Sequence, residues 1–180
     1  MITKEAAHQH MLHCIEIAKQ VSPTIFKPYV GAMVLSQSGE ILAEGKRDFY
    51  ENTKWLYHAE RAALESVKPR SKAKNGIIIT TLEPCVESKE NQLFRPCSKL
   101  IKEYGISTVI FGCLEKSRSN ANGDGINALE KQGIEVIQLT ELSDIIQSEL
   151  MPDFNSRKLY STIKQIISGA YKSHRSKRKY

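Results

Sequence analysis

The sequence contains no long uninterrupted apolar run. Hydrophobic residues make up 41% of its 180 positions, but no apolar stretch approaches the roughly 20 residues that a membrane-spanning helix needs. The N-terminal stretch MITKEAAHQH lacks the apolar core of a secretory signal peptide. These two absences argue against a membrane protein and predict a cytoplasmic location.

Cysteine is also scarce, with only four residues, namely Cys14, Cys85, Cys97 and Cys113. Because the cytosol keeps thiols reduced, we expect no disulfide framework, and metal ligation or burial is the better explanation. Cys14 falls on the apolar face of a predicted helix and Cys113 follows a predicted strand, so both are expected to be small core residues.

The sequence has no internal repeat, and its length suits one core. The excess of positive charge lies at the end of the sequence. Residues 1–150 hold 18 Lys and Arg against 19 Asp and Glu, a net charge of −1, whereas residues 151–180 hold 8 against 1, a net charge of +7. A basic tail attracts polyanions, although a solvated terminus is its commoner explanation. We therefore predict one main domain over 1–155 and a C-terminal basic helix and tail over 156–180.

Apolar periodicity predicts helices that alternate with strands. Thr3 can cap a helix that runs to about Gln20, and YVGAMVLSQSGEILAEGK has the pattern of a β-hairpin. A second helix is expected over about 57–67. The runs GIIIT, STVIFG and GIEVIQL then alternate with helical segments near 97–104 and 125–132, as in β-α-β units. The sequence therefore predicts an α/β domain with a largely parallel sheet.

Three potential zinc ligands stand at the junctions of these elements: His58 in YHAERAAL, Cys85 in TLEPC and Cys97 in RPC. A catalytic zinc ion takes three protein ligands and keeps a fourth position for water, and His nitrogen and Cys thiolate are both suitable donors. Both cysteines are expected where a helix begins, and the helix dipole favours a thiolate there. The sequence therefore predicts that His58, Cys85 and Cys97 bind Zn2+.

Glu60 lies two residues after His58 and is better suited to proton transfer than to ligation. As a fourth ligand it would fill the position that a catalytic zinc keeps open. A His-x-Glu motif followed by Pro-Cys-x-x-Cys is the signature of zinc deaminases, in which the Glu is a general acid and base and not a ligand. The predicted reaction is hydrolytic deamination, which converts a ring amine to a carbonyl and releases ammonia.

The sequence resembles the cytidine deaminase-like superfamily, and within it the deaminase domain of riboflavin biosynthesis (diaminohydroxyphosphoribosylaminopyrimidine deaminase-like). The matching segments lie within about 5–155 and include KPYVGAMVLSQSGEILAEG, HAERAAL, TLEPC, PCSKLIKEYGISTVIFG, GDGINALEKQGIEV and DFN. The resemblance implies a three-layer fold with a mixed five-stranded sheet flanked by helices, a zinc ion and a homo-oligomer. It implies the same three ligands, with Glu60 as the proton shuttle, and a small aminopyrimidine or nucleotide as substrate.

Two departures from the riboflavin-type pattern bear on the substrate. Eleven residues, VESKENQLFRP, separate the two cysteines, and Lys27 replaces an Asn before Pro-x-Val-Gly. Both departures fall where that family holds its ribose phosphate. We expect Lys27, Tyr57 and Arg95 to contact the substrate. The aromatic side chains near Tyr57 can either stack on a flat base or pack as part of a core or lid.

Two other interpretations remain open from the sequence. One is a base deaminase that acts on single-stranded DNA or RNA and uses the basic tail to bind it. The other is a non-catalytic binding protein in which zinc is structural. Glu60 argues against the second, because a purely structural site needs no positioned acid or base.

Overall fold

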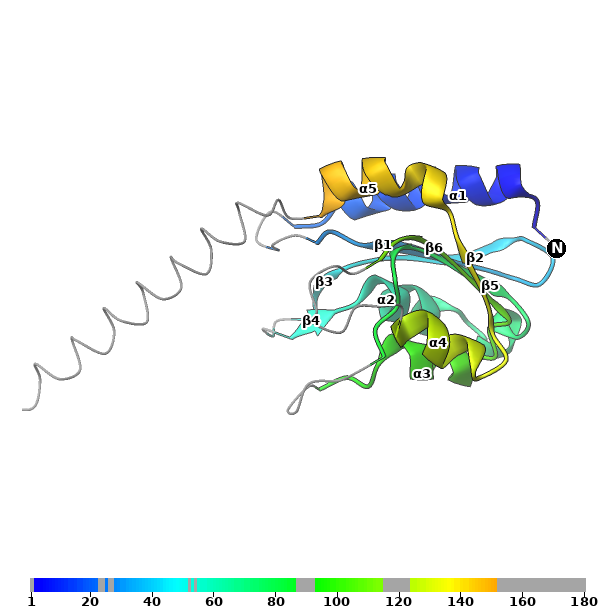
Figure 1. The fold of residues 1–180 in the computed structure, drawn as a ribbon. Coiled ribbons are helices and arrows are strands. Elements are labelled where there is room, and N and C mark those ends of the chain that lie inside the picture. Colours follow the sequence, from blue (N-terminus) through cyan, green and yellow to red (C-terminus); the bar gives the residue numbers. More distant parts are fainter. Residues whose placement is uncertain are drawn as a thin grey trace, which may run out of the picture.

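The computed structural model describes residues 2–22, 25, 28–51, 53, 55–86, 93–114 and 124–151. These residues form three layers, with a sheet between two sets of helices (Figure 1). One outer layer holds α1 (Lys4–Lys19) and α5 (Ser143–Leu150). The other holds α2 (Ala59–Ser66), α3 (Cys97–Glu103) and α4 (Asp124–Glu130). The predicted three-layer α/β architecture is confirmed.

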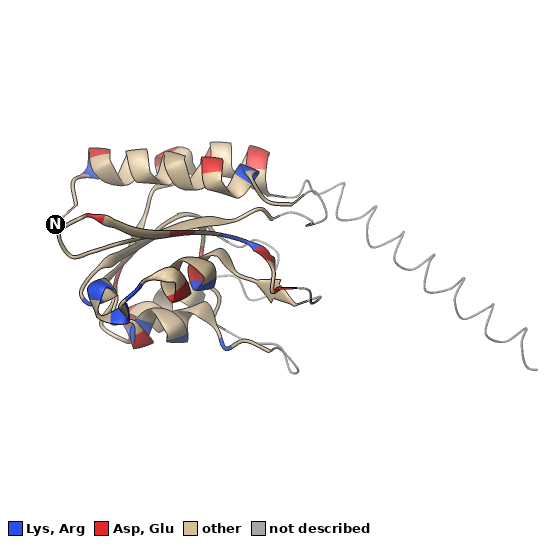
Figure 2. Cartoon of the chain, turned by 180° about the vertical axis from the view of Figure 1, so that it is seen from behind, with Lys and Arg blue, Asp and Glu red and all other residues tan. Residues whose placement is uncertain are grey.

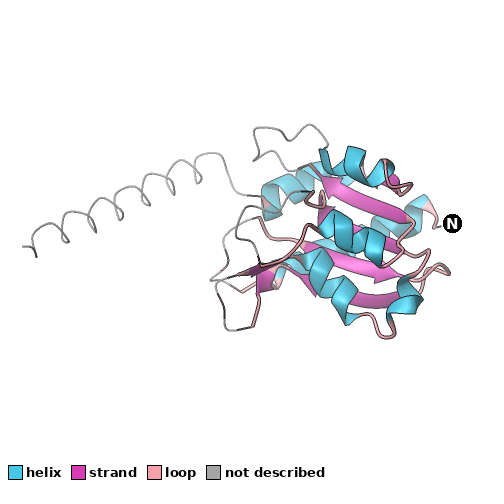
Figure 3. Cartoon of the chain, turned by 90° about the horizontal axis from the view of Figure 1, so that it is seen from below, coloured by secondary structure: helices cyan, strands magenta, loops and turns pink. Residues whose placement is uncertain are grey.

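The central sheet has five strands and is mixed. Its order is β2 (Ile41–Lys46), β1 (Gly31–Leu35), β5 (Ile77–Leu82), β6 (Thr108–Cys113) and β7 (Glu135–Gln138). Strand β1 pairs antiparallel with both of its neighbours, whereas β5, β6 and β7 are parallel to one another. Figure 3 shows helices crossing over these strands. The parallel part arises from helical crossovers and the antiparallel part from the predicted hairpin.

Burial follows the position of each strand in the sheet. Every residue of β1 and β5 is buried, because helices cover both faces of the central strands. The edge strands β2 and β7 keep exposed positions, among them Ile41 and Ile137. The N-cap of α1 is Thr3, whose hydroxyl accepts a hydrogen bond from the backbone N–H of Ala6 at 3.2 Å. Both Cys14 and Cys113 are buried, as predicted.

Several smaller elements were not predicted. The hairpin of β3 (Asp48–Phe49) and β4 (Leu56–Tyr57) lies apart from the main sheet, and η1 (Arg70–Ala73) and η2 (Thr140–Leu142) are short 3-10 helices. The predicted C-terminal helix, the boundary at 155/156 and Lys27 lie outside the described residues.

Charged residues of both signs occur on the outer helices, in keeping with the near balance of charge over residues 1–150 (Figure 2). Within the part of the chain that the structure describes, no helix combines the length and the apolar character that crossing a membrane requires.

Candidate metal centre and active site

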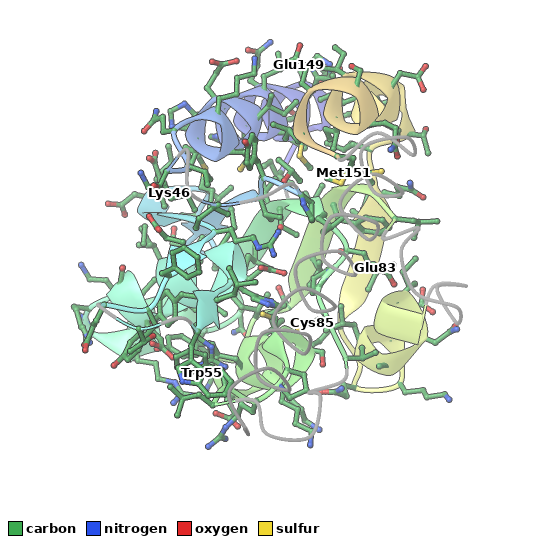
Figure 4. All side chains as sticks on the ribbon, turned by 90° about the vertical axis from the view of Figure 1, so that its left-hand side faces the viewer. Lys46, Trp55, Glu83, Cys85, Glu149 and Met151 are labelled. Carbon is green, nitrogen blue, oxygen red and sulfur yellow. The ribbon has the colours of Figure 1, made fainter. Side chains whose placement is uncertain are left out.

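One edge of the sheet gathers the ends of several elements. The parallel strands β5 and β6 both finish there, and because β1 runs antiparallel to β5, the start of β1 and the end of β2 lie at the same edge. Open α/β sheets bind their ligands outside the carboxyl ends of their parallel strands. The segment that follows β5 carries Cys85, which Figure 4 shows near the centre of this edge.

His58, Cys85 and Cys97 converge at this edge. Their ligand atoms all lie within 4.8 Å of one another, and among the described residues they form the one such group of three or more His, Cys, Asp or Glu side chains. The Nδ1 atom of His58 is 3.5 Å from the Sγ atom of each cysteine. A tetrahedral zinc ion at its usual bond lengths places nitrogen and sulfur ligands about 3.6 Å apart. The three side chains therefore fit a zinc ion.

Each of these residues has a different backbone setting. His58 is the N-cap of α2, and Cys97 is the first residue of α3. The prediction that Cys85 also begins a helix is wrong, because residues 83–86 are irregular. Instead, the backbone N–H of Cys97 donates to Sγ of Cys85 at 3.3 Å, and the N–H of Ser98 donates to the Cys85 carbonyl at 3.1 Å. The start of α3 thus carries Cys97 and donates a backbone hydrogen bond to the sulfur of Cys85.

The thiols of Cys85 and Cys97 shift each other's pKa in opposite directions. A hydrogen bond from the Cys97 thiol lowers the pKa of Cys85 well below its usual range, helped by His58 and opposed by burial. The same hydrogen bond, together with burial, raises the pKa of Cys97. Burial lowers the pKa of His58, but hydrogen bonding to Cys85 and the charge of Glu60 outweigh it, so the net shift is upward. Cysteine binds a metal ion as the thiolate, so a metal ion that binds both sulfurs requires each thiol to lose its proton.

Glu60 stands beside this group. It lies in the first turn of α2 and is only 4% exposed. Its negative charge raises the pKa of both His58 and Cys97, so its carboxylate is within electrostatic reach of two of the three ligand side chains. The structure therefore brings together the four residues that the sequence singled out for chemistry.

The predicted substrate contacts have other partners. The Tyr57 hydroxyl donates to Glu65, and the Tyr57 ring centroid lies 5.3 Å from those of Tyr50 and Phe94. The guanidinium of Arg95 pairs with Glu103 on α3, where both side chains are exposed. Within the described residues, Tyr57 is thus packed in an aromatic cluster and Arg95 forms a surface ion pair.

Two arginines near the site were not predicted. Arg47 follows β2 and donates a hydrogen bond to the Pro28 carbonyl. Its positive charge partly opposes the upward shift in the pKa of His58. Arg61 follows Glu60 on α2 and is buried. The position of Arg47 at the end of a predicted hairpin strand was a usable signal. For Arg61 the i,i+4 pair with Glu65 was a usable signal, whereas its bond to the Arg95 carbonyl left none.

Glu83 anchors the segment that leads to Cys85. It is buried, and its Oε1 accepts a hydrogen bond from the backbone N–H of Gly125 in α4 at 2.9 Å. A Cβ atom at Gly125 would lie 2.6 Å from that oxygen and 2.7 Å from the backbone carbonyl oxygen of Pro84, so the close approach requires glycine. The sequence TLEPC therefore combines a structural carboxylate with a potential ligand.

Comparison with known proteins agrees with this geometry. Residues 4–113 match the family described as the cytidine and deoxycytidylate deaminase zinc-binding region. The chain belongs to this deaminase family. Within it, the resemblance to the deaminases of riboflavin biosynthesis is confirmed by a relative from Corynebacterium ammoniagenes, the riboflavin biosynthesis protein RibD, which is 30% identical over 138 residues. That match covers 77% of this chain and 37% of the relative.

Solved structures of the same kind share the fold. A diaminohydroxyphosphoribosylaminopyrimidine deaminase/5-amino-6-(5-phosphoribosylamino)uracil reductase from Thermotoga maritima superposes with a TM-score of 0.65 at 31% identity, over 81% of this chain and 39% of that one. The Rib2 deaminase of Aspergillus oryzae, a C-terminal deletion mutant, has a TM-score of 0.64 at 19% identity, over 87% of this chain and 97% of that one. This chain thus spans less than two fifths of the length of its relatives from Corynebacterium and Thermotoga.

Proposed function

We propose that this chain is a zinc-dependent hydrolytic deaminase that converts a ring amine of a small aminopyrimidine nucleotide to a carbonyl and releases ammonia. One observation carries the proposal: the ligand atoms of His58, Cys85 and Cys97 converge within 4.8 Å while the buried Glu60 stands beside them. A structural zinc site needs no such carboxylate, so the arrangement supports catalysis over simple metal binding.

The four residues have two roles, metal binding and proton transfer. His58, Cys85 and Cys97 would hold the zinc ion, which when bound lowers the pKa of water from about 15.7 to about 7 and so supplies hydroxide at neutral pH. Glu60 accepts the proton released by the water and delivers it to the ring nitrogen next to the amine-bearing carbon. It then takes the proton of the hydroxyl newly bonded to that carbon and passes it to the amine, so that the carbonyl forms as the carbon–nitrogen bond breaks and ammonia leaves. Because Glu60 is buried, bulk water does not compete for these transfers.

The substrate class is proposed from the relatives and from Arg47. The Thermotoga relative is named as a deaminase of a phosphoribosylaminopyrimidine, a compound with a phosphate group. In this chain Arg47 brings positive charge close to His58, and its hydrogen bond to the Pro28 carbonyl fixes the direction of the guanidinium. A guanidinium has five donors and is well suited to a phosphate. We therefore place the anionic group of the substrate next to Arg47.

Zinc content and ammonia release test the proposal together. The purified full chain is expected to hold about one zinc ion, because three ligands and a water complete a tetrahedral site. Ammonia release is then measured with cytosine and adenine nucleosides, their nucleotides, the riboflavin-pathway pyrimidine and a mixed single-stranded oligonucleotide. We expect release from an aminopyrimidine nucleotide. Release from the oligonucleotide alone, or from no compound by zinc-loaded protein, would contradict the proposal.

Replacement of the acid and base tests the role of Glu60. Glu60→Gln keeps the shape of the side chain but cannot carry a proton, so turnover is expected to fall by about 100-fold or more while zinc content and fold are retained. Glu44→Gln, an exposed carboxylate on β2 that contacts His13, is the matched control and should keep full activity. If Glu60→Gln retains more than about a tenth of the turnover, another group carries the proton.

A further inference from the structure

Arg61 makes three contacts that converge from different parts of the chain. Its Nη1 donates to Glu65 at 2.5 Å, its Nη2 donates to the Arg95 carbonyl at 2.8 Å, and its guanidinium carbon lies 5.0 Å from the centre of the Phe94 ring. The residue is 6% exposed. A buried guanidinium is costly unless its donors are paired, so these contacts account for its burial. Two of them fall on the segment that leads directly into Cys97.

The same segment is joined to the β3–β4 hairpin by aromatic contacts. The Phe94 ring centroid lies 5.1 Å from that of Tyr50 in an edge-on arrangement and 5.3 Å from that of Tyr57. The Tyr57 hydroxyl donates to Glu65, the carboxylate that also accepts from Arg61. Residues 94 and 95 are therefore fixed to α2 by Arg61 and to the hairpin by ring packing.

The spacing of the cysteines makes this attachment important. In the Pro-Cys-x-x-Cys pattern two residues join the cysteines, whereas here eleven residues lie between Cys85 and Cys97. A longer connection costs more entropy to close and constrains the positions of its ends less. The Arg95 carbonyl, held by Arg61, provides a fixed point two residues before Cys97.

We propose that Arg61 is a positioning residue for the metal centre: by holding residues 94–95 against α2, it keeps Cys97 in place to bind the metal together with His58 and Cys85. This inference rests on the zinc site of the proposed function. Arg61 itself needs no contact with metal or substrate for this role, since it acts through the backbone that carries the ligand. Outer contacts of this kind commonly alter metal affinity by about 10–100-fold.

The chain supplies a matched control in Arg70. Its Nη2 donates to the Glu103 carbonyl and its guanidinium carbon lies 4.2 Å from the centre of the Tyr104 ring, so it makes the same kinds of contact at the opposite end of α3. Arg95→Ala is a second control, because Arg61 bonds the main chain of this residue while its side chain pairs with Glu103. Neither replacement should disturb the Cys97 ligand.

The test measures zinc affinity of the full-length variants by competition with a chromophoric chelator, and the cobalt–thiolate absorption band after Co2+ replaces zinc. Arg61→Leu is expected to weaken zinc binding by about 10–100-fold and to alter the cobalt band. Phe94→Ala, at a half-buried position that a folded chain tolerates better, should act in the same direction. Arg70→Leu and Arg95→Ala should stay within about threefold of the unmodified protein.

Each outcome decides between the alternatives. Circular dichroism identifies variants that fold, and if Arg61→Leu does not, Phe94→Ala carries the test. Unchanged zinc affinity and cobalt spectrum in the folded Arg61 and Phe94 variants would overturn the inference, as would equal weakening by Arg70→Leu. If the unmodified chain binds no zinc, the proposed function itself is wrong. If it binds zinc with an affinity that does not depend on Arg61, only the positioning role of Arg61 is wrong.

Discussion

Two adjacent threonines on β5 differ in whether their buried hydroxyl groups have a hydrogen-bond partner. Thr80 and Thr81 are both completely buried. The Thr81 hydroxyl oxygen accepts a hydrogen bond from the backbone N–H of Gly31 at 3.3 Å, whereas within the described residues the Thr80 hydroxyl has no partner. Successive strand residues point to opposite faces of the sheet, so the two hydroxyls have separate environments.

Replacement of each threonine with valine should therefore affect the free energy of unfolding differently. Thr81→Val is expected to lower the free energy of unfolding by about 1–3 kcal/mol, because the Gly31 N–H loses its acceptor. Thr80→Val should leave that free energy unchanged or raise it, because valine has the same shape and no hydroxyl to desolvate. Urea denaturation of the zinc-loaded variants measures both values. Equal losses in the two variants would show that Thr80 also makes a stabilising hydrogen bond.

At the residue level, the sequence identified those side chains whose chemistry is rare and specific. His58, Glu60, Cys85 and Cys97 could be recognised because a zinc deaminase needs these residue types in this order. Arginine is common on surfaces, and its role depends on what it contacts. Arg61 bonds a carbonyl 34 positions away. Such a contact follows from tertiary packing and leaves no local pattern in the sequence.

At the level of elements, the position of α2 on the sheet depends on Gly45 in β2. A Cβ atom at Gly45 would lie 2.3 Å from the Ala59 carbonyl oxygen and 2.4 Å from the Ala63 nitrogen, both in the backbone of α2. No side chain can move aside to relieve this contact. Because His58 and Glu60 stand at the start of α2, the packing at Gly45 sets the position of half of the candidate site.

Gly45→Ala is accordingly expected to destabilise the fold by about 1–3 kcal/mol and to weaken zinc binding, because α2 must shift away from the sheet. Gly39→Ala is the control: Gly39 has φ of +88° and open space around it, so the change strains the turn without moving α2. Thermal unfolding and chelator competition measure the two effects. A Gly45→Ala protein that loses stability but keeps its zinc affinity would separate the packing of α2 from the metal site.

The regular elements were predictable because their apolar residues repeat with the period of a helix or a strand. This held for α1, for the hairpin of β1 and β2, and for the three parallel strands. The two-residue strands β3 and β4 are too short to show any period. Cys85 was wrongly placed at a helix start because Pro-Cys looks the same before a helix and in an extended loop, and here the loop is fixed by the bond between Glu83 and Gly125.

For the whole molecule, zinc should be a source of stability. The three ligands come from α2, the segment after β5 and α3, which the metal would tie together. A ligand present at about 100 times its dissociation constant stabilises the folded state by about 2.7 kcal/mol. Chelation should therefore lower the melting temperature, and added zinc should restore it. Chelator should not change the melting temperature of a Cys85→Ser, Cys97→Ser double variant, and a shift there would point to another metal site.

The concentration of excess positive charge in the last thirty residues leads to a prediction about the substrate. Removing the last ten residues, which hold five Lys and Arg, should leave turnover of a small nucleotide within about twofold, because residues 1–150 contain every proposed catalytic residue. The same truncation should weaken oligonucleotide binding and flatten its dependence on salt. A large loss of turnover on the small nucleotide, with the fold intact by circular dichroism, would show that the tail contributes to the site.

The route by which the chain leaves the described body has a further consequence. Helix α5 ends beside the segment before β1, where the backbone N–H of Tyr29 donates to the Leu150 carbonyl at 2.9 Å, and the neighbouring Pro28 carbonyl accepts from Arg47. In Figure 1 the end of α5 and the β3–β4 hairpin lie at the same side of the molecule. The described part of the chain therefore ends near the edge of the sheet at which His58, Cys85 and Cys97 converge. A covalent tether sets an effective concentration that does not change with dilution, so any effect of the tail on substrate capture should be the same in dilute and concentrated enzyme.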